Sequence, residues 1–103
     1  MKDIYDLITS AQQGSKESEK EIVNSNIPLV KSCMHRFLNL GYEYDDLFQL
    51  GCIGLIKAVR NFDTSYKVRF STYAVPMILG EIRRYIRDSS QIKVSRSLKE
   101  LFM

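Results

Sequence analysis

The sequence has few of the residues that form metal centres and disulfides. Its 103 residues include two cysteines, one histidine and no tryptophan. Cys33 and Cys52 lie inside apolar helical patterns and share no metal-ligand or redox spacing with each other or with His35. We therefore interpret both cysteines as buried thiols and His35 as a packing or surface residue, and we expect no metal site.

Recognisable catalytic groups are also missing. His35 has no carboxylate or cysteine partner at helical spacing. Asp45 and Asp46 are neighbours, so on a helix they point about 100° apart and do not easily share a proton or a metal ion. There is no glycine-rich phosphate loop. We expect no enzyme, no catalytic residue and no cofactor, and the missing ligand set disfavours a zinc or thiol enzyme.

Long hydrophobic runs are absent as well. The first residues, MKDIYDLITSAQQ, alternate between apolar and polar types and so lack the apolar core of a secretory signal. No stretch reaches the roughly 18 apolar residues that a membrane span needs. We expect a cytoplasmic protein that does not associate with a membrane.

Charge is distributed unevenly along a chain that is long enough for one domain. Hydrophobic residues make up 45% and charged residues 26%, which favours a soluble folded protein. Residues 1–59 carry six Lys/Arg and eight Asp/Glu (6 − 8 = −2), whereas residues 60–103 carry nine and four (9 − 4 = +5). Either these are ordinary solvating charges, or the C-terminal part binds a polyanion.

Helical periodicity predicts an all-α fold, a compact bundle of about four to five helices over residues 1–90. We expect a short peripheral helix before Gly14, a new start at Ser15, another at Asn26 with Pro28 behind it, and an end at Gly41. Further helices are expected from Asp45 to Val59 and from about Ser71 to Asp88, joined by a loop over residues 61–69. Pro76 should kink the last helix or move its true start. Residues 91–103 should be a connector, beginning near Ser89, and the truncated start of a following domain.

Two glycines interrupt the predicted helix 45–59, whose apolar positions are Leu47, Leu50, Ile53, Ile56 and Val59. Gly51 and Gly54 each cost roughly 1 kcal/mol relative to alanine inside a helix. Something therefore approaches the backbone closely there, and a tightly packed helix is a simpler explanation than a ligand.

The last helix is predicted to have two unlike sides. Its apolar residues fall within one arc of about 120°: Val75, Ile78, Leu79, Ile82, Tyr85 and Ile86. The opposite side carries Tyr73, Pro76, Gly80, Arg83, Arg84 and Arg87. Guanidinium groups bind phosphate, and a glycine allows close approach, so this side suits a nucleic acid.

Rings and cations alternate just before and at the start of that helix, at Lys67, Arg69, Phe70 and Tyr73. Unpaired bases stack on aromatic side chains for roughly 1–3 kcal/mol each, so this pattern favours single-stranded or melting DNA over duplex. Phe70 could equally be a core residue. Tyr66 and Tyr73 are better candidates for exposure.

Three runs, DDLFQLGCIGLIKAVRNFD, VRFSTYAVPMILGEIRRYIRD and KVSRSLKEL, resemble the second conserved region of sigma factors of the sigma-70 class. The resemblance covers roughly Asn26 to Leu101. Within that class, FSTYAVPMI and VSRSLKEL look most like the sporulation group, near the forespore factors sigma-F and sigma-G. It implies a helical domain that binds core RNA polymerase and recognises and melts the promoter minus-ten element.

The resemblance also implies roles for particular residues. The helix 46–59 would dock on the clamp coiled coil of the largest polymerase subunit through Asp46, Gln49, Leu50, Cys52 and Ile56. The stretch Arg69, Phe70, Ser71, Thr72 and Tyr73 would open DNA and hold the nontemplate strand, with Lys67 beside it. Gly80, Arg83, Arg84 and Arg87 would read the minus-ten element.

The chain departs from housekeeping members of this class at two places. They have two tryptophans where this chain has Pro76 and Met77, so that stacking role is not carried over. Gly80 and Arg83 replace their promoter-reading side chains, so we expect a different preferred sequence. An anti-sigma factor is a further partner implied by the resemblance, and an alternative function is a protein-interaction module held by such an inhibitor, with little DNA binding of its own.

Overall fold

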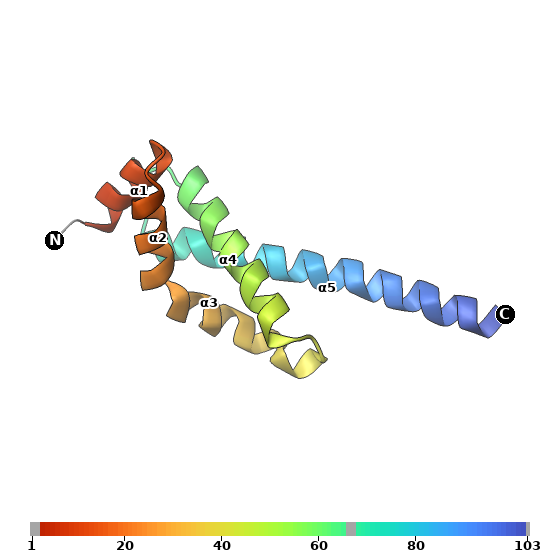
Figure 1. Ribbon diagram of the computed structural model, residues 1–103. Coiled ribbons are helices and arrows are strands. Elements are labelled where there is room, and N and C mark those ends of the chain that lie inside the picture. Colours follow the sequence, from red (N-terminus) through yellow and green to blue (C-terminus); the bar gives the residue numbers. More distant parts are fainter. Residues whose placement is uncertain (1–2, 66–67, 103) are drawn as a thin grey trace.

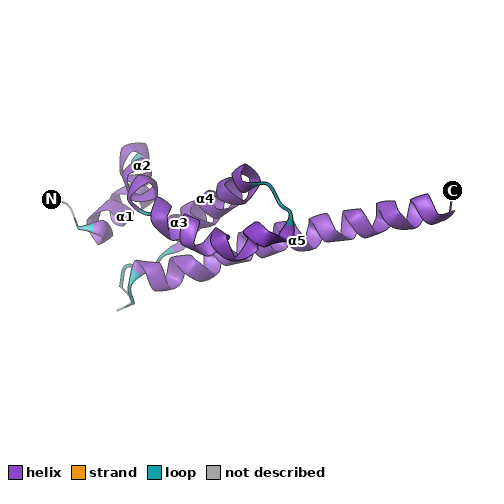
Figure 2. Cartoon of the chain, turned by 90° about the horizontal axis from the view of Figure 1, so that it is seen from below, coloured by secondary structure: helices purple, strands orange, loops and turns teal. Residues whose placement is uncertain are grey.

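The computed structural model describes residues 3–65 and 68–102, with side chains for 3–65 and 68–89. Within these ranges the chain forms five α-helices and one 3-10 helix and contains no strand, which confirms the all-α prediction. The elements are α1 (Ile4–Gln12), α2 (Lys16–Ser25), α3 (Ile27–Met34), the 3-10 helix η1 (His35–Leu40), α4 (Tyr44–Asn61) and α5 (Phe70–Phe102). Figures 1 and 2 show the shorter helices gathered around the first half of α5.

Local capping groups separate the N-terminal helices. Gly14 has a φ of 108°, a left-handed value that side chains disfavour, and it ends the turn after α1. The Ser15 hydroxyl then accepts a hydrogen bond from the Ser18 amide at 3.2 Å and caps α2. A new helix begins directly after Asn26, with Pro28 in its first turn, as predicted. The Asn26 side chain caps the preceding helix, because its amide donates to the Ile22 carbonyl at 2.8 Å at the end of α2.

The segment between Asn26 and Gly41, expected as one helix, changes from an α-helix to a 3-10 helix along its length. The α-helix stops at Met34, and a 3-10 helix continues to Leu40. Gly41, with a φ of 85°, ends this segment, as predicted. Val30, Cys33 and Met34 are buried, while Phe37 and Leu38 in the 3-10 helix are half-buried.

The core lies mainly between α4 and α5, which make the most extensive contact between any two elements. Helices α1, α2 and α3 close it from the other sides. Its buried residues on these two helices are Leu47, Leu55, Ala58, Val59, Phe70, Ala74, Ile78, Leu79 and Ile82. Burial of apolar surface at roughly 25 cal/mol per Å² is the main stabilising term of such a bundle.

The predicted close approach at the glycines of α4 is confirmed. A Cβ at Gly54 would lie 2.7 Å from the Ile78 Cα and 2.7 Å from the Met77 carbonyl oxygen, both on α5. A Cβ at Gly51 would lie 2.6 Å from Val30 Cγ1 on α3. Because α5 packs against the glycine side, the buried face of α4 turns away from Ile53. Ile53, one of the apolar positions of this helix, lies on the opposite side and is 43% exposed.

Helix α1 is more deeply integrated than the expected peripheral helix. Leu7, Ile8 and Ala11 are buried in the core. The side chain of Gln12 donates hydrogen bonds to the carbonyls of Val59 at 2.9 Å and Phe62 at 2.7 Å. Helix α1 therefore contacts the end of α4 through both apolar burial and hydrogen bonds.

Helix α5 is longer than predicted and extends beyond the bundle in Figure 1. It begins at Phe70, one residue before the expected start, and continues through Pro76. It also continues through residues 89–93, so the break in the helix expected there is absent. That stretch contains no glycine or proline to break a helix. The boundary near residue 90 between two domains stays a prediction.

Within the described ranges, no helix has both the length and the apolar character required to cross a membrane.

The two helical glycines Gly54 and Gly80 should respond to alanine in opposite ways. Overpacking costs about 1–3 kcal/mol, and we expect the upper end for Gly54→Ala because the neighbour is backbone that cannot rotate away. A Cβ at Gly80 meets nothing within 4 Å, so Gly80→Ala should raise the free energy of unfolding by about 0.5–1 kcal/mol. Urea unfolding of both variants measures this, and a stabilising Gly54→Ala would contradict the packing described.

Candidate nucleic-acid interface

Helix α5 has the two unlike sides that the sequence predicts. Ile78, Leu79 and Ile82 are buried, and the flanking apolar residues of that side are half-buried. Arg83, Arg84 and Arg87 are all exposed. The arginine side (Gly80, Arg83, Arg84 and Arg87) thus faces away from the core.

Ion pairs of these arginines are few and exposed. Arg84 Nη1 lies 3.1 Å from Glu81 Oε1, and Arg87 Nε lies 3.4 Å from the carboxylate of the adjacent Asp88. Among the described residues, Arg83 makes no ion pair. Exposed pairs of this kind contribute about 0–1 kcal/mol, so exchanging them for a phosphate costs little.

Glu81 joins the two main helices. Its carboxylate, whose side chain is 12% exposed, forms an ion pair with Lys57 of α4 and another with Arg84. The hydrogen bond from Lys57 is the largest influence, and it lowers the pKa of Glu81 below its ordinary value. Glu81 therefore stays ionised and compensates one of the arginines on this side of α5.

Gly80 lies in the arginine side, and it is half-buried. A Cβ there would meet no atom within 4 Å, so the space beside it is open. Internal packing in the described structure therefore does not require a glycine here, and the sugar-phosphate backbone of a nucleic acid can approach it closely.

The segment at the start of α5 divides between surface and core. Arg69, Ser71 and Thr72 are exposed, and Tyr73 is half-buried. Phe70 is only 2% exposed. Of the two roles left open for it, the structure shows the core role. Its assignment as a residue that contacts DNA directly is therefore corrected. Its ring packs edge-on against Phe62, with centroids 5.5 Å apart.

Two further residues named from the sequence, Tyr66 and Lys67, lie outside the described residues.

A hollow of about 280 Å³ lies where the loop after α4 meets the first turn of α5. It is lined by Phe62, Val68, Thr72 and Tyr73, and we call it the aromatic hollow. The rings of Phe62 and Tyr73 are 5.6 Å apart and tilted by 43°. Sequence reasoning missed Phe62 and Val68 because the loop has no periodicity; the only available signal was an aromatic residue immediately after the helix.

The residues expected to bind polymerase share the outer side of α4, away from α5. Asp46 and Gln49 are exposed, while Leu50, Cys52 and Ile56 are half-buried. Ile53, which is exposed, lies between them on the same side at helical spacing. This outer side therefore combines an acidic and an amide group with an exposed apolar centre.

The two cysteines are thiols in low-polarity surroundings. Cys33 is buried, as predicted, whereas Cys52 is half-buried. Desolvation raises the pKa of both thiols, and the nearby Arg36 opposes this at Cys33. Neither is activated as a nucleophile.

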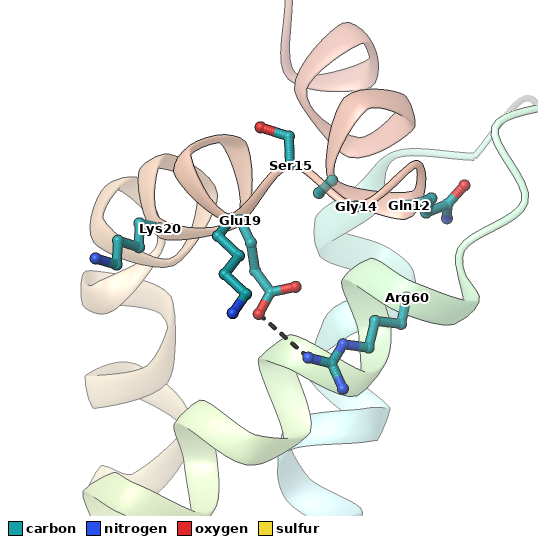
Figure 3. Close-up of a pocket in the computed structure, with 8 residues that line it drawn as sticks. Gln12, Gly14, Ser15, Glu19, Lys20 and Arg60 are labelled. Atoms are coloured by element: carbon teal, nitrogen blue, oxygen red, sulfur yellow. Dashed lines mark hydrogen bonds and ion pairs between the residues drawn. The ribbon is translucent and has the colours of Figure 1, made fainter.

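A second pocket of about 420 Å³ lies between the α1–α2 turn and α4 (Figure 3). Arg60 of α4 reaches across it to Glu19 of α2, with 3.4 Å between Nη2 and Oε1. Lys16 and Lys20 also line it. The pocket mixes both signs of charge, and its ion pair fastens α2 to α4.

Comparison with known proteins decides the family. Residues 22–92 match the family model described as Sigma-70 region 2, and this range includes both the outer side of α4 and the arginine side of α5. The chain belongs to the sigma-70 region 2 family.

Sigma-F and sigma-G factors are among the most similar relatives of this sigma-70 region 2 chain. It is 60% identical over 99 residues to the RNA polymerase sigma-F factor of Priestia megaterium, and 58% identical over 99 residues to that of Bacillus subtilis (strain 168). It is 52% identical over 100 residues to the RNA polymerase sigma-G factor of Clostridium acetobutylicum. These matches cover 96–97% of this chain but only 39% of each relative. The predicted resemblance to sporulation sigma factors is confirmed.

The Glu81 carboxylate gives this sigma-70 region 2 fold a pH-dependent contact. Its folded pKa is lowered, so its stabilising contribution is present above the unfolded value of about 4.5 and is lost as the pH falls through the folded pKa. Glu81→Gln should therefore lower the melting temperature at pH 7, and the difference from wild type should shrink towards pH 3. Melting curves across this range test it; a difference that grows on acidification would contradict the assignment.

Proposed function

We propose that this chain is the promoter-recognition part of a sporulation sigma factor, which binds core RNA polymerase and engages the melted minus-ten element. The observation that carries the proposal is the continuity of two features on α5. The aromatic hollow lies at its first turn, and the arginine side follows along the same helix.

Single-stranded DNA suits this combination better than duplex DNA. A duplex offers phosphates to cations but keeps its base faces stacked, whereas an open strand offers both phosphates and base faces. The aromatic hollow provides a ring-lined space of about 280 Å³, and the arginines provide cations. We propose that an unstacked base of the nontemplate strand enters the hollow.

The spacing along α5 supports a strand of several nucleotides. From Tyr73 to Arg87 the helix advances by about 21 Å at 1.5 Å per residue. A stacked strand advances roughly 3.4 Å per nucleotide and an unstacked strand advances further, so this length corresponds to at most about six nucleotides. A short promoter element therefore fits between the hollow and the last arginine.

Polymerase docking is proposed for the outer side of α4. Asp46 and Gln49 are exposed and would face a basic, hydrogen-bonding partner, while the half-buried Leu50 and Ile56 provide apolar surface beside them. This side points away from the α4–α5 contact, so a partner can bind it without displacing α5. We propose the clamp coiled coil of the largest polymerase subunit as that partner, an action in the cytoplasm, and no catalytic step by the chain itself.

Arg83 and Arg87 should account for much of the salt dependence of strand binding. In holoenzyme assembled from the full-length protein, Arg83→Ala with Arg87→Ala should weaken binding of a labelled minus-ten single strand. It should also reduce the slope of log affinity against log salt by about 1.4, or roughly 0.7 per phosphate lost. Titration at several salt concentrations measures both.

The charge-matched control is Lys16→Ala with Lys20→Ala, which removes two cations from α2. It should leave the salt slope nearly unchanged. If both double variants behave like wild type, the DNA-binding proposal fails, and a protein-interaction module held by an anti-sigma factor becomes the better explanation.

Asp46 and Gln49 should matter for polymerase binding and leave folding intact, because both are exposed. Asp46→Ala or Gln49→Ala should reduce recovery of the largest polymerase subunit in a pulldown with the full-length protein. Glu21→Ala, an exposed carboxylate of α2, is the control and should recover normal amounts. Normal recovery with both α4 variants would count against this surface.

A further inference from the structure

The side chain of Gln12 holds the backbone at the end of α4. Helix α4 ends at Asn61, and Phe62 follows in an extended conformation with φ −69° and ψ 130°. The last carbonyls of a helix have no partner within the helix. The Gln12 amide donates to Val59 O at 2.9 Å and to Phe62 O at 2.7 Å, so one amide group with two donors satisfies both acceptors.

The ring of Phe62 is held from the same direction. It stacks on Tyr5 of α1, with centroids 6.1 Å apart and an angle of 28° between the planes. On its other sides it meets Phe70 at 5.5 Å and Tyr73 at 5.6 Å. Both the backbone and the ring of Phe62 are therefore fixed between α1 and α5.

Phe62 also forms one wall of the aromatic hollow, together with Tyr73. The Phe62 ring is 5% exposed and touches the more exposed Tyr73 ring, with centroids 5.6 Å apart, so its position fixes the position of the Tyr73 ring in the hollow. Base stacking requires close ring contact, so a displaced wall weakens it. Helix α1 lies before the matched range 22–92, and through its contacts with Phe62 it influences the proposed strand-binding site.

We propose that Gln12 is a positioning residue: by hydrogen bonding the carbonyls of Val59 and Phe62, it keeps the aromatic hollow in the shape that accepts an unstacked base. This role rests on the proposed function of the hollow. Gln12 need not touch the DNA, because it acts through Phe62.

The first test measures strand binding by holoenzyme made from the full-length protein. Gln12→Ala should weaken binding of a labelled single strand carrying a minus-ten sequence by about fivefold or more, as expected if one stacked base is poorly held. Recovery of core polymerase by this variant should stay normal, because the outer side of α4 is unchanged.

A matched control separates positioning from loss of stability. Asn26→Ala removes the same type of bond, a side-chain amide donating at 2.8 Å to a carbonyl at a helix end, but it lies between α2 and α3 and does not line the hollow. Both variants should lower the melting temperature, and only Gln12→Ala should weaken strand binding. Equal losses of affinity in the two variants would overturn the positioning role.

A second readout locates the effect on a single base. Strands with one abasic nucleotide at each position of the element should reveal the position whose loss weakens wild-type binding most. At that position the difference between wild type and Gln12→Ala should disappear, because there is no base left to stack. A difference that persists at every position would refute the role.

The same experiment distinguishes failure of the proposed DNA binding from failure of the positioning role of Gln12. If wild-type holoenzyme binds the strand without any dependence on Arg83 and Arg87, the DNA-binding proposal falls. If that dependence is present but Gln12→Ala behaves like Asn26→Ala, only the positioning role falls.

Discussion

The approach of α5 to Gly54 determines how the two main helices face each other. With 2.7 Å between a would-be Cβ and the backbone of Met77 and Ile78, α4 and α5 are as close as a glycine allows. Ile78 and Ile82 then lie in the core, and the arginines of α5 lie on the outside. The same contact turns Asp46, Gln49 and Ile53 of α4 outwards. One packing constraint therefore separates a surface suited to a protein partner from a surface suited to an opened strand.

Electrostatic contacts add to this arrangement without setting it. Glu81 links Lys57 and Arg84, and Glu19 links to Arg60, but these pairs involve exposed cations and contribute little compared with the buried apolar core. The consequence is functional. Internal pairing neutralises only part of the positive charge on α5: Arg84 pairs with Glu81, Arg83 makes no ion pair among the described residues, and Arg87 pairs only with its exposed neighbour Asp88.

Sequence patterns predicted the elements well where a local signal exists. The left-handed Gly14 and Gly41, the close approach at Gly51 and Gly54, and the two sides of α5 all follow from residue type or from helical periodicity. Helix α4 carries apolar residues on more than one side, and periodicity alone does not say which side meets a neighbour. The structure buries Leu47 and Val59 and leaves Ile53 exposed.

The rest depends on long-range contacts that no local pattern encodes. Gln12 and Phe62 are 50 residues apart, and their hydrogen bond integrates a helix that looked peripheral. Phe70 sits among rings and cations that suggest stacking with DNA, yet its ring is buried beside Phe62. The aromatic hollow forms where the loop after α4 meets the first turn of α5, so it could not be predicted from either segment alone.

Photo-crosslinking in the open promoter complex tests the central claim most directly. With a photoreactive amino acid at position 83 or at position 53 of the full-length protein, the two outward surfaces report their partners separately. The structure predicts that position 83 labels the nontemplate strand and position 53 labels the largest polymerase subunit. If position 83 labels only protein, or position 53 labels DNA, the division of surfaces set by the α4–α5 contact is wrong.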